Sequence, residues 1–161
     1  MVIVYAVKGF DGANLPLDNP LQVPAHRYSG RVLASGKEAV RTTPKFERGR
    51  LLGDVVFVSG TAAIKGEDSE FSEDTRVQAL GAIDVVEHLV APSNISPNCS
   101  AFRFGYLRVY VRRPQDLEPV REMFISHFRD TPIHFLQADI CRPELLLELE
   151  GVGRALPFLK P

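Results

Sequence analysis

The sequence has no excess of charge of either sign, because 19 Lys and Arg residues stand against 20 Asp and Glu residues. A chain that binds nucleic acid usually carries a basic excess gathered on one element. Cysteine is scarce too, and neither Cys99 nor Cys141 stands in a metal-ligand spacing; the four histidines share none either. The composition therefore predicts no nucleic-acid partner and no metal site, and it favours a small molecule or a protein as ligand.

Long apolar runs are missing as well, since none approaches the roughly 20 residues that a membrane span needs. The opening "MVIVYAVKGFDG" has no basic region before its short apolar run and no small-residue cleavage site after it. We therefore expect a cytoplasmic protein without a membrane partner. A chain of this length can bury an adequate core without disulfides, so we expect one domain over residues 1–161.

Two helices are predicted by capping signals and by apolar residues at helical spacing. The first is expected from Ser72, which two acids follow, to about Val90, with buried positions at 79, 83, 86 and 90. The second is expected to begin at Asp116, with Pro119 in its first turn and apolar positions at 117, 120, 124 and 128. The stretch "APSNISPNCS" between them is expected to be a loop.

Strands are expected on both sides of these helices. Short pieces at 2–7 and around 28–33 come first, followed by "DVVFVSGTAAI", which ends near Gly60. "FRFGYLRVYVRR" lies between the helices, and "HFLQADIC" and "ELLLELEG" close the chain. This order predicts an α+β sheet with both helices on one face.

The central strand alternates between an apolar face and a polar-aromatic face. Leu107, Val109 and Val111 point one way, whereas the other face carries Tyr106, Arg108, Tyr110 and Arg112. If the helices cover the apolar face, the second face is either solvated or packed against other subunits, where Tyr and Arg are enriched.

The last two strands place ionisable groups among apolar residues. If they form a hairpin with an even loop, Gln137 lies opposite Glu148, and both share a face with Asp139 and Cys141. A carboxyl group among leucines tends to have a raised pKa, which suits a general acid. The alternative is that Glu148 forms a salt bridge with Arg108 or Arg142 across a subunit boundary, and the spacing does not decide between the two.

Three stretches together resemble the RidA (YjgF) family: "VFVSG", "RVYVRRPQDLEPVREMFISHF" and "ELLLELEG". The resemblance covers about 46–152. It implies a RidA/YjgF-like, or chorismate-mutase-like, six-stranded mixed sheet with two helices on one face, assembled as a homotrimer with sites between subunits. RidA enzymes that hydrolyse imines hold the substrate carboxylate with an arginine two residues after a proline. Here Pro132 is followed by Ile133 and His134, which disfavours RidA-type enamine or imine hydrolysis.

A second group with this fold fits better. "NPLQVPAHRY", "FVSGTAAI", "RVYVR" and "LQADICRPELLLELEG" resemble the chorismatases, the pteridine-dependent dioxygenase-like family, which cleave the enolpyruvyl ether of chorismate without metal or organic cofactor. The resemblance implies that Glu148 is the general acid, and that the segment after "SG" and the pair Cys141 and Arg142 border the pocket. Arginines are needed to hold a dicarboxylate, and the candidates considered are Arg108, Arg112 and Arg142.

The sequence thus favours a cofactor-independent chorismatase-like enzyme that acts on a small carboxylated enol ether, with chorismate cleavage and release of pyruvate as the specific hypothesis. The alternatives are a RidA-like enamine or imine hydrolase and a non-catalytic, metabolite-binding trimer. Chorismatases carry a second domain of similar size, and this chain resembles their C-terminal half alone. The predicted substrate-binding residues are Gly60, Thr61, Ala62, Tyr106, Arg108, Gln137, Cys141 and Arg142.

Overall fold

The structure is a computed structural model that describes residues 8–30, 43–70 and 73–158. The strand predicted at 2–7 lies outside these residues. The piece predicted around 28–33 is described only as far as Gly30, and there it is wrong, because Tyr28 ends the short 3₁₀ turn η1 (Ala25–Arg27) and lies in no strand.

A six-stranded mixed sheet forms the centre of the protein, in the order β1-β2-β3-β8-β6-β7. All neighbouring strands are antiparallel except β6 and β7, which are parallel. A small hairpin of β4 and β5 stands apart from the sheet. The bounds are β1 Asn14–Leu17, β2 Gly49–Leu52, β3 Val55–Thr61, β4 Ile64–Lys65, β5 Asp68–Ser69, β6 Cys99–Val111, β7 Ile133–Gln137 and β8 Leu147–Pro157.

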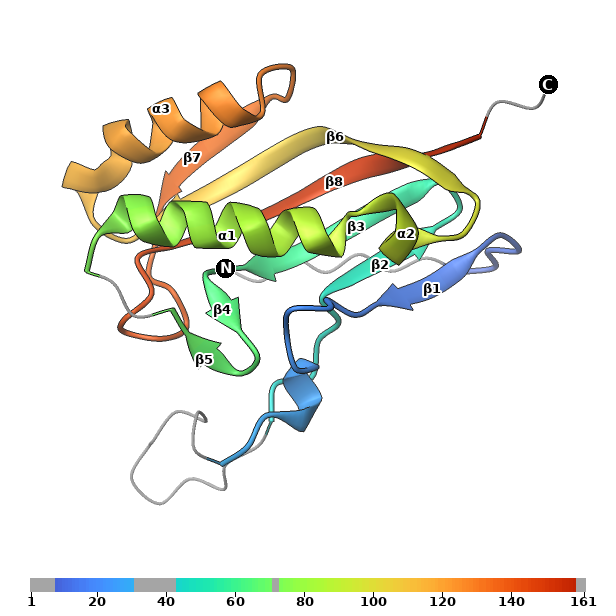
Figure 1. The fold of residues 1–161 in the computed structure, drawn as a ribbon, viewed down its shortest axis with the longest axis horizontal. Helices are drawn as coiled ribbons and strands as arrows, with labels where there is room; N and C mark the ends of the chain where they lie inside the picture. The colour runs from blue at the N-terminus through green and yellow to red at the C-terminus, as the bar shows by residue number, and fades with distance from the viewer. Residues whose placement is uncertain (1–7, 31–42, 71–72, 159–161) are drawn as a thin grey trace.

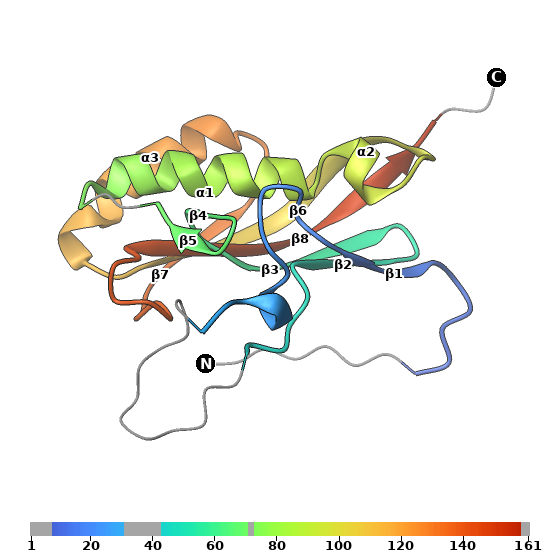
Figure 2. The ribbon, with the colours of Figure 1, turned by 60° about the horizontal axis from the view of Figure 1, so that its bottom comes forward.

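Both long helices cover the same face of this sheet, as Figures 1 and 2 show for α1 (Thr75–Leu89) and α3 (Leu117–His127). The predicted α+β architecture is therefore confirmed. The predicted loop at 91–100 is partly wrong, because it contains the short helix α2 (Pro92–Ile95) and the start of β6.

The two helix starts differ from the expectation in detail. Asp74, rather than Ser72, occupies the N-cap of α1, and its side chain accepts a hydrogen bond from the Arg76 amide at 2.8 Å. Asp116 precedes α3 but makes no capping bond. Its carboxylate instead accepts from the Thr75 hydroxyl and Arg113 Nε, both at 2.5 Å, and so connects the starts of the two helices.

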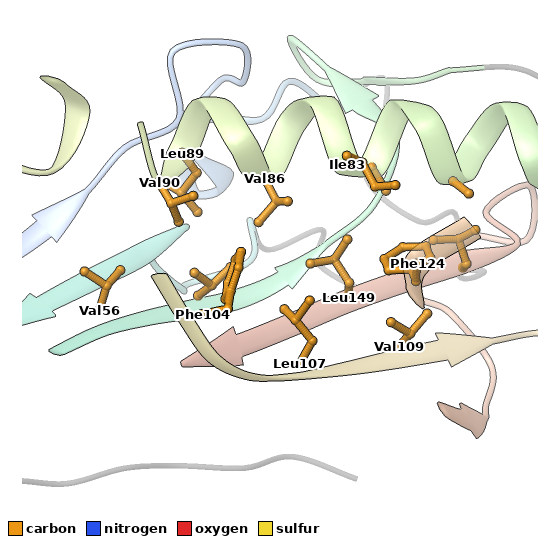
Figure 3. Packing of buried hydrophobic residues seen from close by; sticks show 14 of the residues in the cluster. Val56, Ile83, Val86, Leu89, Val90, Phe104, Leu107, Val109, Phe124 and Leu149 are labelled. Atoms are coloured by element: carbon orange, nitrogen blue, oxygen red, sulfur yellow. The ribbon is translucent and has the colours of Figure 1, made fainter. Parts of the chain in front are cut away.

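The core lies between the helices and the sheet. Ile83, Val86 and Leu89 of α1 point down onto apolar side chains of β3, β6 and β8, and Phe124 of α3 closes the layer (Figure 3). Burying each such side chain contributes about 1.5–3 kcal/mol. Leu107 and its alternate neighbours in β6 are fully buried, so β6 must turn its other side chains to the opposite face.

The hairpin predicted for the last two strands does not form, because β6 lies between β7 and β8. The chain leaves β6, forms α3 and returns as β7 parallel to β6, which is the usual outcome of a helical crossover. It then crosses under the end of β6, and β8 inserts between β3 and β6. Gln137 therefore pairs with Val111, and Glu148 pairs with Tyr110.

Candidate functional site

The sheet face that α1 and α3 leave uncovered gathers polar and aromatic side chains from β6 and β8. We call this the open face. Arg108 pairs in register with Glu150, and Tyr110 pairs with Glu148. These four side chains and Tyr106 are half-buried. The structure thus places the predicted Tyr106, Arg108 and Glu148 on one face, as the strand alternation required.

Glu150 is held by two neighbours. Arg108 Nε lies 2.9 Å from Glu150 Oε1, and the Tyr110 hydroxyl donates a hydrogen bond to the same oxygen. The guanidinium of Arg108 also lies 5.7 Å from the centre of the Tyr106 ring. Burial and the bond to Glu150 raise the pKa of Tyr110 to about 12, so this phenol remains a hydrogen-bond donor at neutral pH.

Glu148 has the opposite environment. Among the described residues, nothing donates a hydrogen bond to its carboxyl group or forms an ion pair with it. Burial, and then the negative charge of Glu150, raise the pKa of Glu148 above its usual value. Within the described chain, Arg108 pairs with Glu150 instead of Glu148. Two carboxyl groups on one face therefore differ in role, and Glu148 is the one suited to give up a proton.

Gly60 makes room for this carboxyl group. A Cβ on Gly60 would stand 2.7 Å from Cδ of Glu148, which is closer than real Cβ atoms come to any neighbour. The register of β3 shifts at this point, between Val58 and Thr61. The absence of a side chain at Gly60 therefore has a steric cause, and the site explains a glycine within a strand.

Thr61 and Ala62, both predicted to bind substrate, lie in different surroundings. Ala62 is buried in a small apolar cluster with Leu145, against which Tyr110 packs, so it lines the surroundings of the open face. Thr61 pairs with Leu149, a core residue, and its hydroxyl donates to the Ser59 carbonyl at 2.9 Å. Its side chain is thus satisfied within the chain and lies away from Glu148.

The connection between β7 and β8 carries Cys141 and Arg142. Burial raises the pKa of the Cys141 thiol, and the charge of Glu148 raises it further. Arg142 Nη1 donates to the Glu67 carbonyl at 2.9 Å and to Ser69 Oγ at 3.0 Å.

Gln137 and Asp139 do not belong to this constellation. Gln137 is exposed and aligned with Val111, whose side chain lies on the helix-covered face. The Asp139 side chain is 94% exposed and forms an ion pair with Arg112 at 3.3 Å. The expected position of both residues opposite β8 depended on the hairpin register, and that register is wrong.

Arg112, considered above as a substrate-binding arginine, stabilises the connection between β7 and β8. Its guanidinium donates to the carbonyls of Ile140, Arg142 and Leu145 at 2.7–2.9 Å. It therefore holds the connection that carries Cys141, and little of its hydrogen-bonding capacity is left for a ligand.

Arg48 and Tyr28 were missed by the sequence reasoning. The Arg48 carbonyl accepts from the Ser59 amide at 3.0 Å, so Arg48 lies across from the residue before Gly60. Its side chain is only 4% exposed, with its guanidinium 5.4 Å from the Tyr28 ring centre and 5.2 Å from that of Phe46. Both missed residues come from the proline-punctuated segment, where no periodic pattern indicated which side chains turn inward.

No three or more His, Cys, Asp or Glu side chains among the described residues are grouped so that they could hold a metal ion. In the same part of the chain, no helix is both long enough and apolar enough to cross a membrane.

Comparison with known sequences gives relatives of one kind. No protein-family model matches the chain. A 3-hydroxybenzoate synthase from Streptomyces hygroscopicus is 32% identical over 165 residues, covering 94% of this chain and 46% of that protein. A chorismatase from Streptomyces rapamycinicus is 29% identical over 163 residues, covering 94% of this chain and 47% of that protein. The chain spans about half the length of these curated relatives.

Solved structures with a similar fold include members of the YjgF family. A member of the YjgF/YER057c/UK114 family from Mycobacterium tuberculosis has a TM-score of 0.55 at 18% identity, over 68% of this chain and 86% of that one. Yeast Mmf1 has a TM-score of 0.66 at 14% identity, over 89% of this chain and 100% of that one. The chain therefore has the RidA/YjgF-like fold, as predicted.

Within this superfamily the likeness is to part of a chorismatase. A crystal structure of a chorismatase has a TM-score of 0.75 at 28% identity, over 88% of this chain and 44% of that chain. The predicted resemblance is thus confirmed in both sequence and structure.

Proposed function

We propose that this protein is a cofactor-independent, chorismatase-like enzyme that acts on a small carboxylated enol ether, with Glu148 as its general acid. Chorismate cleavage with release of pyruvate is the specific reaction we propose. The observation that supports it is the environment of Glu148, which has a raised pKa, no partner among the described residues, and a place beside Gly60 on the open face. The similarity to chorismatases supports the choice of substrate.

The chemistry needs one acid at the right place. Glu148 donates its proton to the methylene carbon of the enolpyruvyl group, which leaves an oxocarbenium ion at the ether carbon. Water adds to that carbon and gives one proton to the Glu148 carboxylate, so the acid is restored and a hemiketal remains. The bond between the former ether carbon and the ring oxygen then breaks as the hemiketal hydroxyl gives its proton to that oxygen, which releases pyruvate and the ring alcohol.

The neighbours of Glu148 favour this cycle. Glu150 is hydrogen-bonded by Tyr110 and paired with Arg108, so its negative charge stays close to Glu148 and raises its pKa. The same negative charge is placed to stabilise a cationic transition state. Arg108, engaged with Glu150, therefore acts in positioning and charge balance.

The assembly we propose is a homotrimer of single-domain chains whose open faces meet, with each site at a subunit boundary. Half-buried tyrosines and an arginine on the open face support this, because these residue types are enriched at interfaces. Gly60, Ala62, Tyr106, Arg108, Cys141 and Arg142 are then the neighbours of a small carboxylated metabolite.

The test is incubation of purified protein with chorismate and enzymatic assay of pyruvate. The Glu148→Gln variant keeps the shape of the side chain without its acid, and we expect kcat to fall about 10²–10⁴-fold. The wild-type kcat should decline as the pH rises through the raised pKa of Glu148, because the ionised form cannot donate. The matched control is Glu118→Gln on α3, which is exposed and should retain full activity.

Two outcomes decide against the proposal: no pyruvate from the wild type, or undiminished turnover by Glu148→Gln. If carboxylated metabolites raise the melting temperature and mass spectrometry recovers them unchanged, the protein is a metabolite-binding scaffold instead.

A further inference from the structure

Arg48 is a buried cation that has no carboxylate partner among the described residues. Nη2 donates to the Val23 carbonyl at 3.1 Å and to the Tyr28 hydroxyl. Nε is buried, and within the described part of the chain nothing accepts a hydrogen bond from it. No carboxylate among the described residues forms an ion pair with Arg48. A buried charge of this kind is costly unless something neutralises it.

A second arginine approaches the same aromatic ring. The Arg142 guanidinium lies 5.3 Å from the Tyr28 ring centre, and that of Arg48 lies 5.4 Å from it. Contact with an aromatic ring stabilises each cation, but two like charges around one ring repel each other.

The acids in this neighbourhood are engaged elsewhere. Glu67 accepts from the amide and the hydroxyl of Ser29 at 2.7 and 2.6 Å. Glu144 accepts from Ser69 Oγ at 2.7 Å, and this hydroxyl also accepts from Arg142. Neither Glu67 nor Glu144 forms an ion pair with either guanidinium of the pair within the described part of the chain, so no described carboxylate balances the two positive charges around Tyr28.

Two connections place this pair of arginines beside Glu148. Arg48 is hydrogen-bonded across to Ser59, whose neighbour Gly60 contacts the Glu148 carboxyl. Arg142 reaches the same region through Tyr28, whose hydroxyl accepts from Arg48 and whose ring centre lies 5.3 Å from the Arg142 guanidinium. The next residue after Arg48, Gly49, faces Leu17 and Leu89 on the helix-covered side, so Arg48 turns to the open face.

We propose that Arg48 and Arg142, with Tyr28 between them, form a subsite for a carboxylate group of a small ligand. The inference rests on the proposed function in one respect, namely that this carboxylate belongs to the molecule whose other end receives the Glu148 proton. Adjacent strands are about 4.8 Å apart, so a residue that pairs with β3 lies about 10 Å from β8. A small unsaturated acid can bridge that distance to Glu148.

The ligand class is a carboxylate because an arginine with free N–H groups pairs strongly with a planar carboxylate. Tyr28 supplies an aromatic surface for a flat ring or double bond. The resulting site differs from the one expected from the sequence, since Arg108 and Arg112 are occupied within the chain and Arg48 takes their role.

A matched pair of probes tests the subsite without any turnover. 3-Hydroxybenzoate and 3-hydroxybenzamide have the same ring, and only the first carries a carboxylate. By calorimetric titration of the full chain, we expect the acid to bind at least ~10-fold more tightly than the amide. Inorganic phosphate at the same concentration should not displace it; displacement would assign the subsite to phosphate and overturn the carboxylate.

Arg48→Met keeps the apolar stem and removes the charge, so it should abolish the preference for the acid. Arg50→Met is the control, because Arg50 follows two residues later, is exposed, and pairs with Glu47 at 2.6 Å. It should preserve the preference. Equal binding of both probes by the wild type, or an intact preference in Arg48→Met, overturns the inference.

A measurement on the wild type covers the case in which Arg48→Met does not fold. The Nε–H signal of Arg48, assigned through its side chain from the backbone, should shift in ¹⁵N-¹H spectra on addition of the acid and stay in place with the amide. An unmoved signal overturns the subsite. If the protein binds the acid selectively but releases no pyruvate from chorismate, only the general-acid proposal is wrong. If it releases pyruvate but its preference for the acid does not depend on Arg48, only the subsite is wrong.

Discussion

Glu148 and Glu150 show how environment separates two identical groups. They are two residues apart in β8 and point to the same face. Glu150 is held by Arg108 and Tyr110, whereas nothing in the described chain holds Glu148, whose pKa is raised. The difference follows from cross-strand register, because β6 places its arginine opposite one glutamate and its tyrosine opposite the other.

Gly60→Ala is the sharpest steric test of this arrangement. The new Cβ would stand 2.7 Å from Cδ of Glu148, so the carboxyl group must move out of its place. Overpacking of this kind costs about 1–3 kcal/mol, and we expect that loss in urea unfolding together with lower activity. Gly105→Ala is the control, because its Cβ would meet only the Val152 carbonyl, at 3.4 Å. If Gly60→Ala is as stable and active as Gly105→Ala, the close approach of Gly60 to the Glu148 carboxyl group contributes neither to stability nor to activity.

At single positions, the sequence predicted the acid better than its surroundings. Glu148 stood out because a carboxyl group among leucines is unusual, which is a local signal, and the resemblance to chorismatases implied its role as the acid. Arg48 gave no such signal, since an arginine in "KFERGR" looks like any solvated charge. Its side chain contacts Tyr28 and the Val23 carbonyl, which lie 20 and 25 positions before it, and no local pattern indicates such contacts.

Among the elements, the sequence identified the strand faces correctly and the strand neighbours incorrectly. Period-two alternation states which side chains share a face of one strand, and this was right for β6. It does not state which strand pairs with which. Arg142 and Pro143 were expected to join two paired strands, but residues 138–146 pass the end of β6 instead. Gln137 and Asp139 therefore do not lie opposite residues of β8.

Asp74→Ala tests the observed start of α1. The substitution removes the acceptor for the Arg76 amide and should lower stability to urea by about 0.5–2 kcal/mol. Asp74→Asn retains an acceptor without the charge, so it should lose much less. Equal losses in the two variants would show that the charge matters and the capping bond does not.

For the whole molecule, the open question is what meets the open face. We propose that other copies of the chain do, and Leu136 offers a clean test because it is 38% exposed and pairs in register with Tyr110. We expect light scattering to show three chains for the wild type. Leu136→Asp should shift the protein to monomers, since an unpaired charge in an interface costs several kcal/mol.

The matched control is Leu80→Asp. Leu80 is 60% exposed on α1, on the helix-covered side of the molecule, so the same charge there should leave the assembly intact. A wild type that is monomeric at micromolar concentration would remove both the trimer and the subunit-boundary site.

The most direct test of the account is the titration of Glu148 itself. In protein labelled at the glutamate side-chain carboxyl carbon, ¹³C NMR follows each glutamate with pH, and the signal absent from Glu148→Gln belongs to Glu148. We expect a midpoint above the ordinary value of 4.5, because burial and the charge of Glu150 disfavour the ionised form of Glu148. A midpoint at or below 4.5 would contradict the account, since Glu148 would then be an ordinary carboxylate with no proton to give.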